Sequence, residues 1–147
     1  MKKSNLSPEE YSEMLSSIEL RQILLNDCSA KKHDIKSKGG TIDLDISMRL
    51  GYDQNANEAN FLVTYKLEGI KRSDSEEEKV FTISASFLLS YLKKKEVEIT
   101  KEFVNIFKEN SIELVSWPYF REFVQNMISR MGFPPLTLPS KFFSISK

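Results

Sequence analysis

Few side chains in this sequence could do chemistry, and Cys28 and His33 are the first pair to consider. They are the only cysteine and the only histidine, and five positions separate them. Such a pair can act as nucleophile and base if a third group orients the histidine and an oxyanion site faces the cysteine. The sequence shows neither feature. We therefore interpret Cys28 as a structural residue and His33 as a surface residue.

Asp43 and Asp45 are the second candidate, a pair of carboxylates of the kind that acid–base catalysis uses. They lie two positions apart in a segment with strict apolar–polar alternation, which places both on the polar face of a strand. No partner base or metal ligand accompanies them, and we interpret them as solvated side chains. Gly-rich phosphate loops, HExxH and GxSxG are also absent from the sequence. The sequence thus predicts neither an enzyme nor a metal or cofactor site.

Trp117, Tyr119 and Phe120 could form an aromatic platform for a ligand. They lie beside apolar residues at helical spacing, which predicts a long helix with one apolar stripe. The stripe comprises Phe120, Phe123, Val124, Met127, Ile128 and Met131. Because such a stripe must be covered, we interpret the aromatic residues as core or subunit interface. The residues assigned to an oligomer interface are Trp117, Tyr119, Phe120, Phe123 and Met127.

Composition and charge restrict the possible partners. The 147 residues are 40% hydrophobic and 29% charged, which suits one globular domain. Basic and acidic residues balance at 21 each, so we expect neither nucleic acid nor a membrane as a partner. A single cysteine excludes an intramolecular disulfide and fits a reducing compartment. Because there is no secretory signal and no run near the ~20 apolar residues of a membrane span, we expect a cytoplasmic protein.

Four strands are predicted between residues 18 and 92. Strict alternation at 41–50 indicates a strand with one apolar face. The other strands are expected at 18–30, 61–68 and 81–90. Polar segments at 52–60 and 69–79 are expected to be turns, which makes the sheet antiparallel. The inward-facing residues of the first strand are expected to be Leu20, Leu24 and Cys28.

Helices are predicted on both sides of the strands in the sequence. Ser7 and Pro8 indicate the start of a short helix within residues 1–17, ending near Ser16. Thr100 can cap a second helix that ends near Asn110. The long helix is expected to start at Ser116, with Pro118 in its opening turn, and to end at Met131.

The C-terminal segment is expected to be extended. Gly132 can end the long helix in left-handed geometry, and three prolines hold residues 132–147 as an arm. Strands followed by helices predict one α+β domain over residues 1–147. In this domain the helices at 100–131 pack on one face of a four-stranded antiparallel sheet.

Residues 117–138, WPYFREFVQNMISRMGFPPLTL, resemble the C-terminal signature of the SecB-type protein-export chaperones. That signature has an aromatic–Pro–Tyr opening, an Arg–Glu pair, a helix ending in Ser–Arg, a Phe–Pro step and a Leu–Pro arm. The matching positions are Trp117, Pro118, Tyr119, Arg121, Glu122, Ser129, Arg130, Phe133, Pro134, Leu136 and Leu138. The segments IELRQILLNDCS and TIDLDI resemble the first two strands of the family more weakly, and together the likeness covers roughly half of the chain.

The resemblance implies a SecB-like domain that works as a holdase, an ATP-independent chaperone that keeps unfolded polypeptides from aggregating. It also implies a homo-oligomer, a dimer or tetramer built from strand edges and long helices, and no cofactor. Unfolded clients require apolar grooves and free strand edges rather than a catalytic cleft. We accordingly assign client binding to Ile42, Leu44, Leu136, Leu138, Phe142 and Phe143.

The chain departs from the family at two surfaces. The connection at 31–40 is short and lacks the aromatic residues that wall the family's client groove. On the face that receives the export motor SecA, Asp27 matches one acidic position, but Lys31 and Thr82 replace acids. The net charge is zero, whereas the exporters are strongly acidic. SecA is therefore a doubtful partner.

Two functions are compatible with the sequence. The first is a holdase, either for protein export or for one dedicated client such as the antitoxin of a toxin–antitoxin pair, as in some divergent SecB-like proteins. The second is an adaptor module that binds a single protein partner without chaperone activity.

Overall fold

The computed structural model describes residues 5–36, 39–73 and 76–141. Within these ranges, one short helix precedes four consecutive strands, and a long helical segment follows them. The elements are α1 (Pro8–Ser16), β1 (Ile18–Lys32), β2 (Ile42–Gln54), β3 (Glu58–Arg72), β4 (Glu77–Lys93), α2 (Lys101–Phe107), the π-helical turn η1 (Lys108–Ile112) and α3 (Glu113–Arg130).

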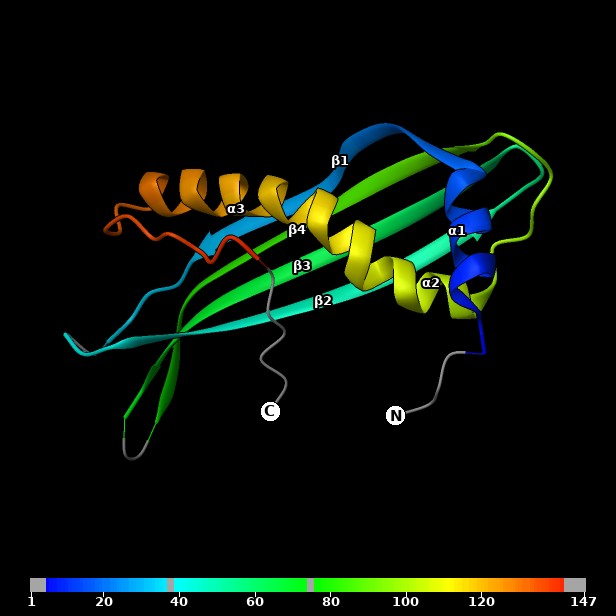
Figure 1. Cartoon of the computed structure of the whole chain (residues 1–147). Coiled ribbons are helices and arrows are strands. Elements are labelled where there is room, and N and C mark those ends of the chain that lie inside the picture. Colours follow the sequence, from blue (N-terminus) through cyan, green and yellow to red (C-terminus); the bar gives the residue numbers. More distant parts are fainter. Residues whose placement is uncertain (1–4, 37–38, 74–75, 142–147) are drawn as a thin grey trace.

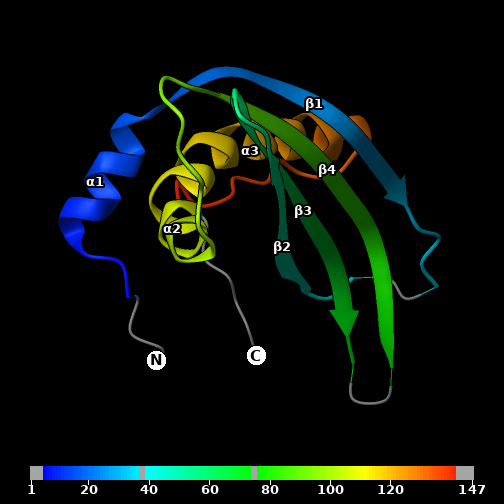
Figure 2. The same cartoon turned by 90° about the vertical axis from the view of Figure 1, so that its right-hand side faces the viewer.

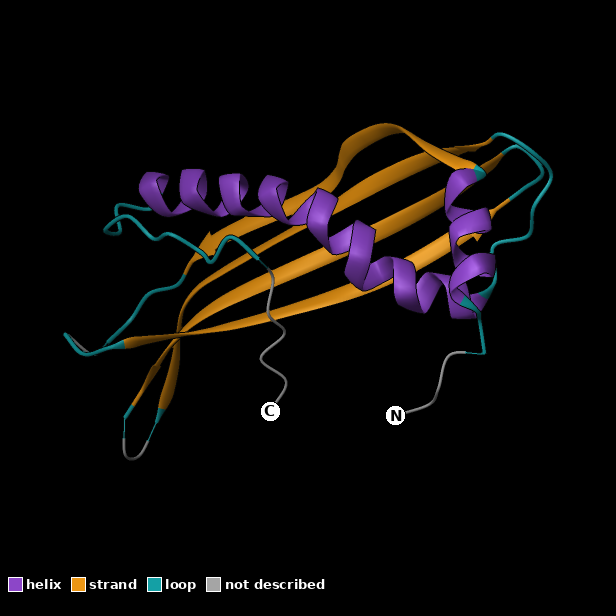
Figure 3. Cartoon of the chain, viewed as in Figure 1, coloured by secondary structure: helices purple, strands orange, loops and turns teal. Residues whose placement is uncertain are grey.

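The four strands form one antiparallel sheet in the order β1-β4-β3-β2. The sheet is twisted and curved, and the helices lie along its concave face (Figures 1, 2 and 3). Alternate side chains of β3 and β4 face the helices and are buried, whereas β1 and β2 are the edge strands. The predicted α+β arrangement, with C-terminal helices packed on one face of the sheet, is confirmed.

The hairpin between β2 and β3 is tighter than the sequence pattern predicts. The pattern predicts a loop at 52–60, but β2 continues to Gln54 and β3 begins at Glu58. The side-chain oxygen of Asn55 accepts hydrogen bonds from the backbone N–H groups of Asn57 and Glu58, at 2.8 and 3.0 Å. One Asx-type turn therefore closes the hairpin, and the polar residues around it are strand residues.

The charged segment at 69–79 also differs from the predicted turn. β3 continues to Arg72, and β4 begins at Glu77. The Arg72 guanidinium bonds Asp43 and Asp45 of β2, both at 3.1 Å, and Glu77 of β4 at 3.0 Å. One arginine thus links three neighbouring strands. Arg72 and Glu77, which look like turn residues in the sequence, therefore belong to strands and form cross-strand pairs.

The predicted inward-facing set of β1 is wrong for Leu24. Its cross-strand partner is Leu88, whose side chain lies on the outer face of the sheet, whereas Leu20 and Cys28 pair with inward-facing residues of β4. Register shifts after Leu20 and after Leu25 each insert one extra residue into β1. A β-bulge reverses the alternation of all residues beyond it, and a simple period of two cannot predict this.

The C-terminal helices are continuous, which corrects the predicted break between Asn110 and Ser116. α2, η1 and α3 follow one another without a gap, and Pro118 lies inside α3 instead of in an opening turn. The π-helical turn adds a residue, and both Phe107, just before the turn, and Ile112, its last residue, are buried in the core. Burial of Ile112 offsets the weaker hydrogen bonding of a π turn.

Of the helices in the described ranges, none has both the length and the apolar character of a membrane span.

Candidate functional site

An apolar cavity of about 150 Å³ lies between edge strand β2 and the segment that follows α3. We call residues 133–141 of that segment the C-terminal arm. Most of the cavity lining is aliphatic, aromatic or proline carbon. The residues that line this cavity, which we call the apolar cavity, are Ile42, Leu44, Phe81, Ile128, Phe133, Pro134, Pro135 and Leu136.

Two residues of β2 line the apolar cavity, because apolar and polar residues alternate along this strand and its apolar face points toward the cavity. Ile42 and Leu44 face the helices and are half-buried, while Asp43 and Asp45 point to the outer face and bond Arg72. β2 pairs with β3 along one side only, and within the described ranges no strand pairs with its other side. The cavity therefore lies beside a free strand edge of 13 residues.

The turn after α3 directs the C-terminal arm back over the sheet. Gly132 adopts a positive φ of 81°, its N–H bonds the carbonyl of Ser129, and the N–H of Phe133 bonds the carbonyl of Ile128 at 3.2 Å. These bonds form a Schellman cap, and glycine meets its left-handed residue without steric cost. The prolines after Phe133 then keep the arm extended. Figure 1 shows the arm running alongside α3 over the concave face.

Phe133 is held in place from two sides. Its ring lies 5.5 Å from the ring of Phe81 on β4, and the Lys32 ammonium lies 5.3 Å from its centroid. The same ammonium group donates a hydrogen bond to the carbonyl of Met131 at the end of α3, at 3.2 Å. Lys32 thus combines a helix-terminus contact with a cation–π contact, and both fix the aromatic wall of the apolar cavity.

The structure brings together three of the six residues that we assigned to client binding. Ile42, Leu44 and Leu136 line the apolar cavity. Leu138 is only 4% exposed, belongs to the core and does not line the apolar cavity. Phe142 and Phe143 lie outside the described residues. Sequence reasoning missed the other lining residues, although the Gly–Phe–Pro–Pro step at 132–135 could have indicated that the arm turns back.

The five residues assigned to an oligomer interface have different environments. Trp117 and Phe120 are buried within the subunit, and Phe123 and Met127 are half-buried against the core. Tyr119 is 47% exposed, with its ring 6.1 Å from that of Phe87. Other large exposed apolar side chains on α3 and on β1 are Leu114, Leu25, Leu24 and Leu20.

The side chains considered for chemistry have other contacts. The Nε2 atom of His33 lies 2.9 Å from the hydroxyl of Thr82, and Cys28 is exposed on edge strand β1. Asp43 and Asp45 bond Arg72. Among the described residues, no group of three or more His, Cys, Asp or Glu side chains could hold a metal ion.

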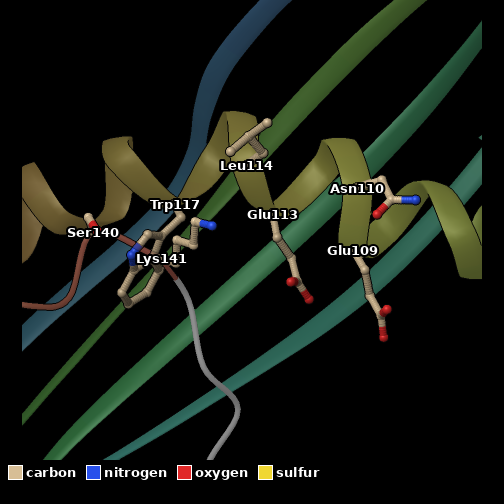
Figure 4. A pocket seen from close by; sticks show the side chains of 7 residues that line it. All are labelled: Glu109, Asn110, Glu113, Leu114, Trp117, Ser140 and Lys141. Atoms are coloured by element: carbon tan, nitrogen blue, oxygen red, sulfur yellow. The ribbon is translucent and has the colours of Figure 1, made fainter.

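A second cavity, of about 240 Å³, lies at the other end of the C-terminal arm (Figure 4). Glu109 and Glu113 line it together with Trp117 and Lys141, and Figure 4 shows Leu114 pointing away from the two carboxylates. Burial raises the pKa of Glu113 above its ordinary value. The positive charge of Lys108 lowers this pKa, and the negative charge of Glu109 raises it. Unlike the apolar cavity, this cavity carries two acids, with Lys141 as a counter-charge, beside the apolar side chains of Leu114 and Trp117.

Comparison with known proteins identifies the fold. Protein-family models give no match to the chain, and no curated protein matches it. The structure of a SecB-like chaperone from Mycobacterium tuberculosis, in complex with a ChAD peptide from the HigA1 antitoxin, superposes with a TM-score of 0.72. The fold is SecB-like. The match covers 88% of this chain and 94% of that chain, at 20% sequence identity.

A second solved structure is more distant. A protein of unknown function from Streptococcus agalactiae gives a TM-score of 0.40 at 12% identity, covering 83% of this chain and 96% of that chain. The SecB-like fold assigned from the sequence signature at 117–138 is thus supported by the Mycobacterium structure, in which the likeness extends far beyond that signature.

Proposed function

We propose that this SecB-like protein is a holdase that binds extended apolar segments of non-native polypeptides at the apolar cavity. The observation that carries the proposal is that Ile42, Leu44 and Leu136 line one cavity beside a strand edge that no described strand pairs with. A client segment can add to such an edge through backbone hydrogen bonds and place alternate side chains in the cavity. Backbone pairing is independent of sequence, so many unfolded segments are acceptable.

Binding of this kind requires no nucleotide. A preformed apolar cavity gains affinity from buried carbon area, and release follows when the client folds and buries that area itself. We therefore expect activity without ATP. The sequence has no Gly-rich phosphate loop, in agreement with this expectation.

A dedicated client is favoured over a role in export. The Mycobacterium structure with the same fold holds an antitoxin peptide. By contrast, on the outer face of β1 and β4, where SecA docking would be expected, Asp27 pairs with Ser86, and Lys31 pairs with Thr82. This mixed and mostly polar surface lacks an acidic cluster for a basic partner among the described residues. We propose an antitoxin-like client and propose no role for SecA.

We propose a homo-oligomer that covers the exposed apolar residues of α3 and β1. Tyr119, Leu114 and Leu25 are exposed beside an edge strand of 15 residues. A second copy could extend the sheet at β1 and bury these side chains in the same interface.

Suppression of aggregation tests the proposed function. The protein should reduce light scattering by an unfolding client at stoichiometric amounts without ATP. Leu44→Asp places a charge in the apolar cavity and should abolish the effect, whereas Leu62→Asp, on the outer face of the sheet, should preserve it. If several clients aggregate at an unchanged rate while one host protein still co-purifies with the chain, the adaptor function replaces the holdase.

A further inference from the structure

A third cavity, of about 190 Å³, lies next to the apolar cavity along the C-terminal arm. Leu136 lines both cavities, so one ligand could occupy both. The third cavity is more polar, and we call it the arginine cavity. Its lining residues are Pro118, Arg121, Glu122 and Gln125 of α3 and Leu136, Thr137 and Leu138 of the arm.

Arg121 carries a buried donor without a partner among the described residues. Its Nε atom makes no hydrogen bond, and no described acid forms an ion pair with its guanidinium. Two other arginines are engaged: Arg72 bonds three acids, and Arg130 bonds Asn126 at 2.7 Å. A buried N–H donor without an acceptor is rare in folded proteins because its desolvation is not compensated. The Nε atom itself is covered from solvent, but the Arg121 side chain lines a cavity that a ligand can enter, and no described acid neutralises its charge.

The other polar groups of the arginine cavity indicate what Arg121 would bind. The Gln125 amide and the Thr137 hydroxyl can also donate hydrogen bonds, so the lining suits an acceptor with negative charge. Glu122 is the one acid in the lining, and its side chain is exposed. Its charge would repel a doubly charged phosphate more than a carboxylate, which a guanidinium binds with two parallel hydrogen bonds.

We propose that Arg121 binds a carboxylate of the client, from an aspartate or glutamate close to the apolar residue that fills the apolar cavity. This inference rests on the proposed function and narrows the client class. The preferred segment is extended, with an apolar residue for the cavity at Ile42 and Leu44 and an acidic residue for Arg121. The arm between the two cavities, at Leu136, sets their spacing.

Two labelled peptides that differ at one position test the inference. Both carry the same apolar residues, and one has a glutamate where the other has a glutamine. Fluorescence anisotropy should show the glutamate peptide binding about tenfold more tightly to the unmodified protein at low salt. Arg121→Gln should remove this preference. Arg130→Gln, an exposed arginine on the same helix, should retain it.

Each outcome is decisive for one of the two proposals. Equal binding of both peptides by the unmodified protein would overturn the role of Arg121, but it would still support client binding at the apolar cavity. Binding of neither peptide would overturn the proposed function and this inference with it. Glu122→Gln gives a check that leaves Arg121 intact. This variant should bind the glutamate peptide about twofold more tightly and bind the glutamine peptide with unchanged affinity. A tightening of both peptides would contradict a charge effect.

Discussion

The indole N–H of Trp117 on α3 donates a hydrogen bond to the carbonyl oxygen of Pro139 in the C-terminal arm, at 2.8 Å. The bond joins the N-terminal part of α3 to the far end of the arm, 22 positions later. With the Schellman cap at Gly132, it fixes the arm at both ends. The arm segment between them, which lines the apolar cavity, is therefore held in shape by one attachment at each end.

Replacing Trp117 tests this attachment. Trp117→Phe keeps a ring in the core but leaves the Pro139 carbonyl without its donor, and we expect a loss of about 1–3 kcal/mol in the free energy of unfolding. Amide exchange should accelerate in residues 136–140 more than in β3. Tyr119→Phe, which removes an exposed hydroxyl, should change stability by less than about 0.5 kcal/mol. Uniform acceleration of exchange throughout the sheet would contradict a local role for the bond.

Gly69 controls the position of one wall of the apolar cavity. It is the cross-strand partner of Phe81, and a methyl group added at Gly69 would overlap the Phe81 ring. Gly69→Ala should therefore displace that ring, cost about 1–3 kcal/mol and weaken client binding. Gly51→Ala is the matched control because nothing lies within 4 Å of its added carbon. Denaturant unfolding and peptide binding measure the two effects, and equal behaviour of the two variants would refute the role of Gly69.

Stability at alkaline pH should depend on two buried tyrosines. Burial raises the pKa of Tyr65 and of Tyr91 to about 12, from 10.0 in the unfolded chain. The folded state then binds more protons than the unfolded state between these values, so this stabilisation is complete below pH 10 and is lost as the pH approaches 12. Tyr91→Phe should make the fall of the unfolding free energy with pH shallower by at most ~1.4 kcal/mol per pH unit. Urea unfolding at several pH values measures this slope. An unchanged slope would show that Tyr91 ionises equally in both states.

The exposed apolar residues of α3 and β1 should determine the oligomeric state. Tyr119 and Leu25 are about half exposed in the single chain, and a charge at either position would oppose burial in an interface. Light scattering should show a dimer or tetramer for the unmodified protein and smaller species for Tyr119→Asp and Leu25→Asp. Leu62→Asp, on the opposite face, should assemble normally. A monomeric unmodified protein at micromolar concentration would rule out the proposed interface.

The sequence predicts the fold well where local pattern and tertiary environment agree. β2 alternates strictly because one face packs on the arm and helices while the other is solvated, and Ser7 and Thr100 cap their helices as expected. The pattern fails at β1, where two bulges change the faces, and at Asn110–Ser116, where burial of Ile112 maintains the helix through polar residues. Both failures come from tertiary contacts that local propensity does not contain.

Three of the eight residues that line the apolar cavity could be anticipated in the same way. Ile42, Leu44 and Leu136 follow from the apolar face of β2 and from the likeness of the arm to the export chaperones. Phe81 and Ile128 look like ordinary core residues in the sequence, because only the path of the arm places the cavity beside them. The unpaired Nε donor of Arg121 also depends on which acceptors lie near it, and this is a property of the folded chain.

The most direct test of the central proposal is to locate a bound client. A photo-crosslinking amino acid is placed at position 44, in the apolar cavity, or at position 62, on the outer face of the sheet. A reduced and alkylated client that stays unfolded is then added without ATP. We expect strong crosslinking from position 44 and little from position 62, with competition by an unlabelled apolar peptide. Equal crosslinking from both positions, or crosslinking from position 62 alone, would contradict client binding at the apolar cavity.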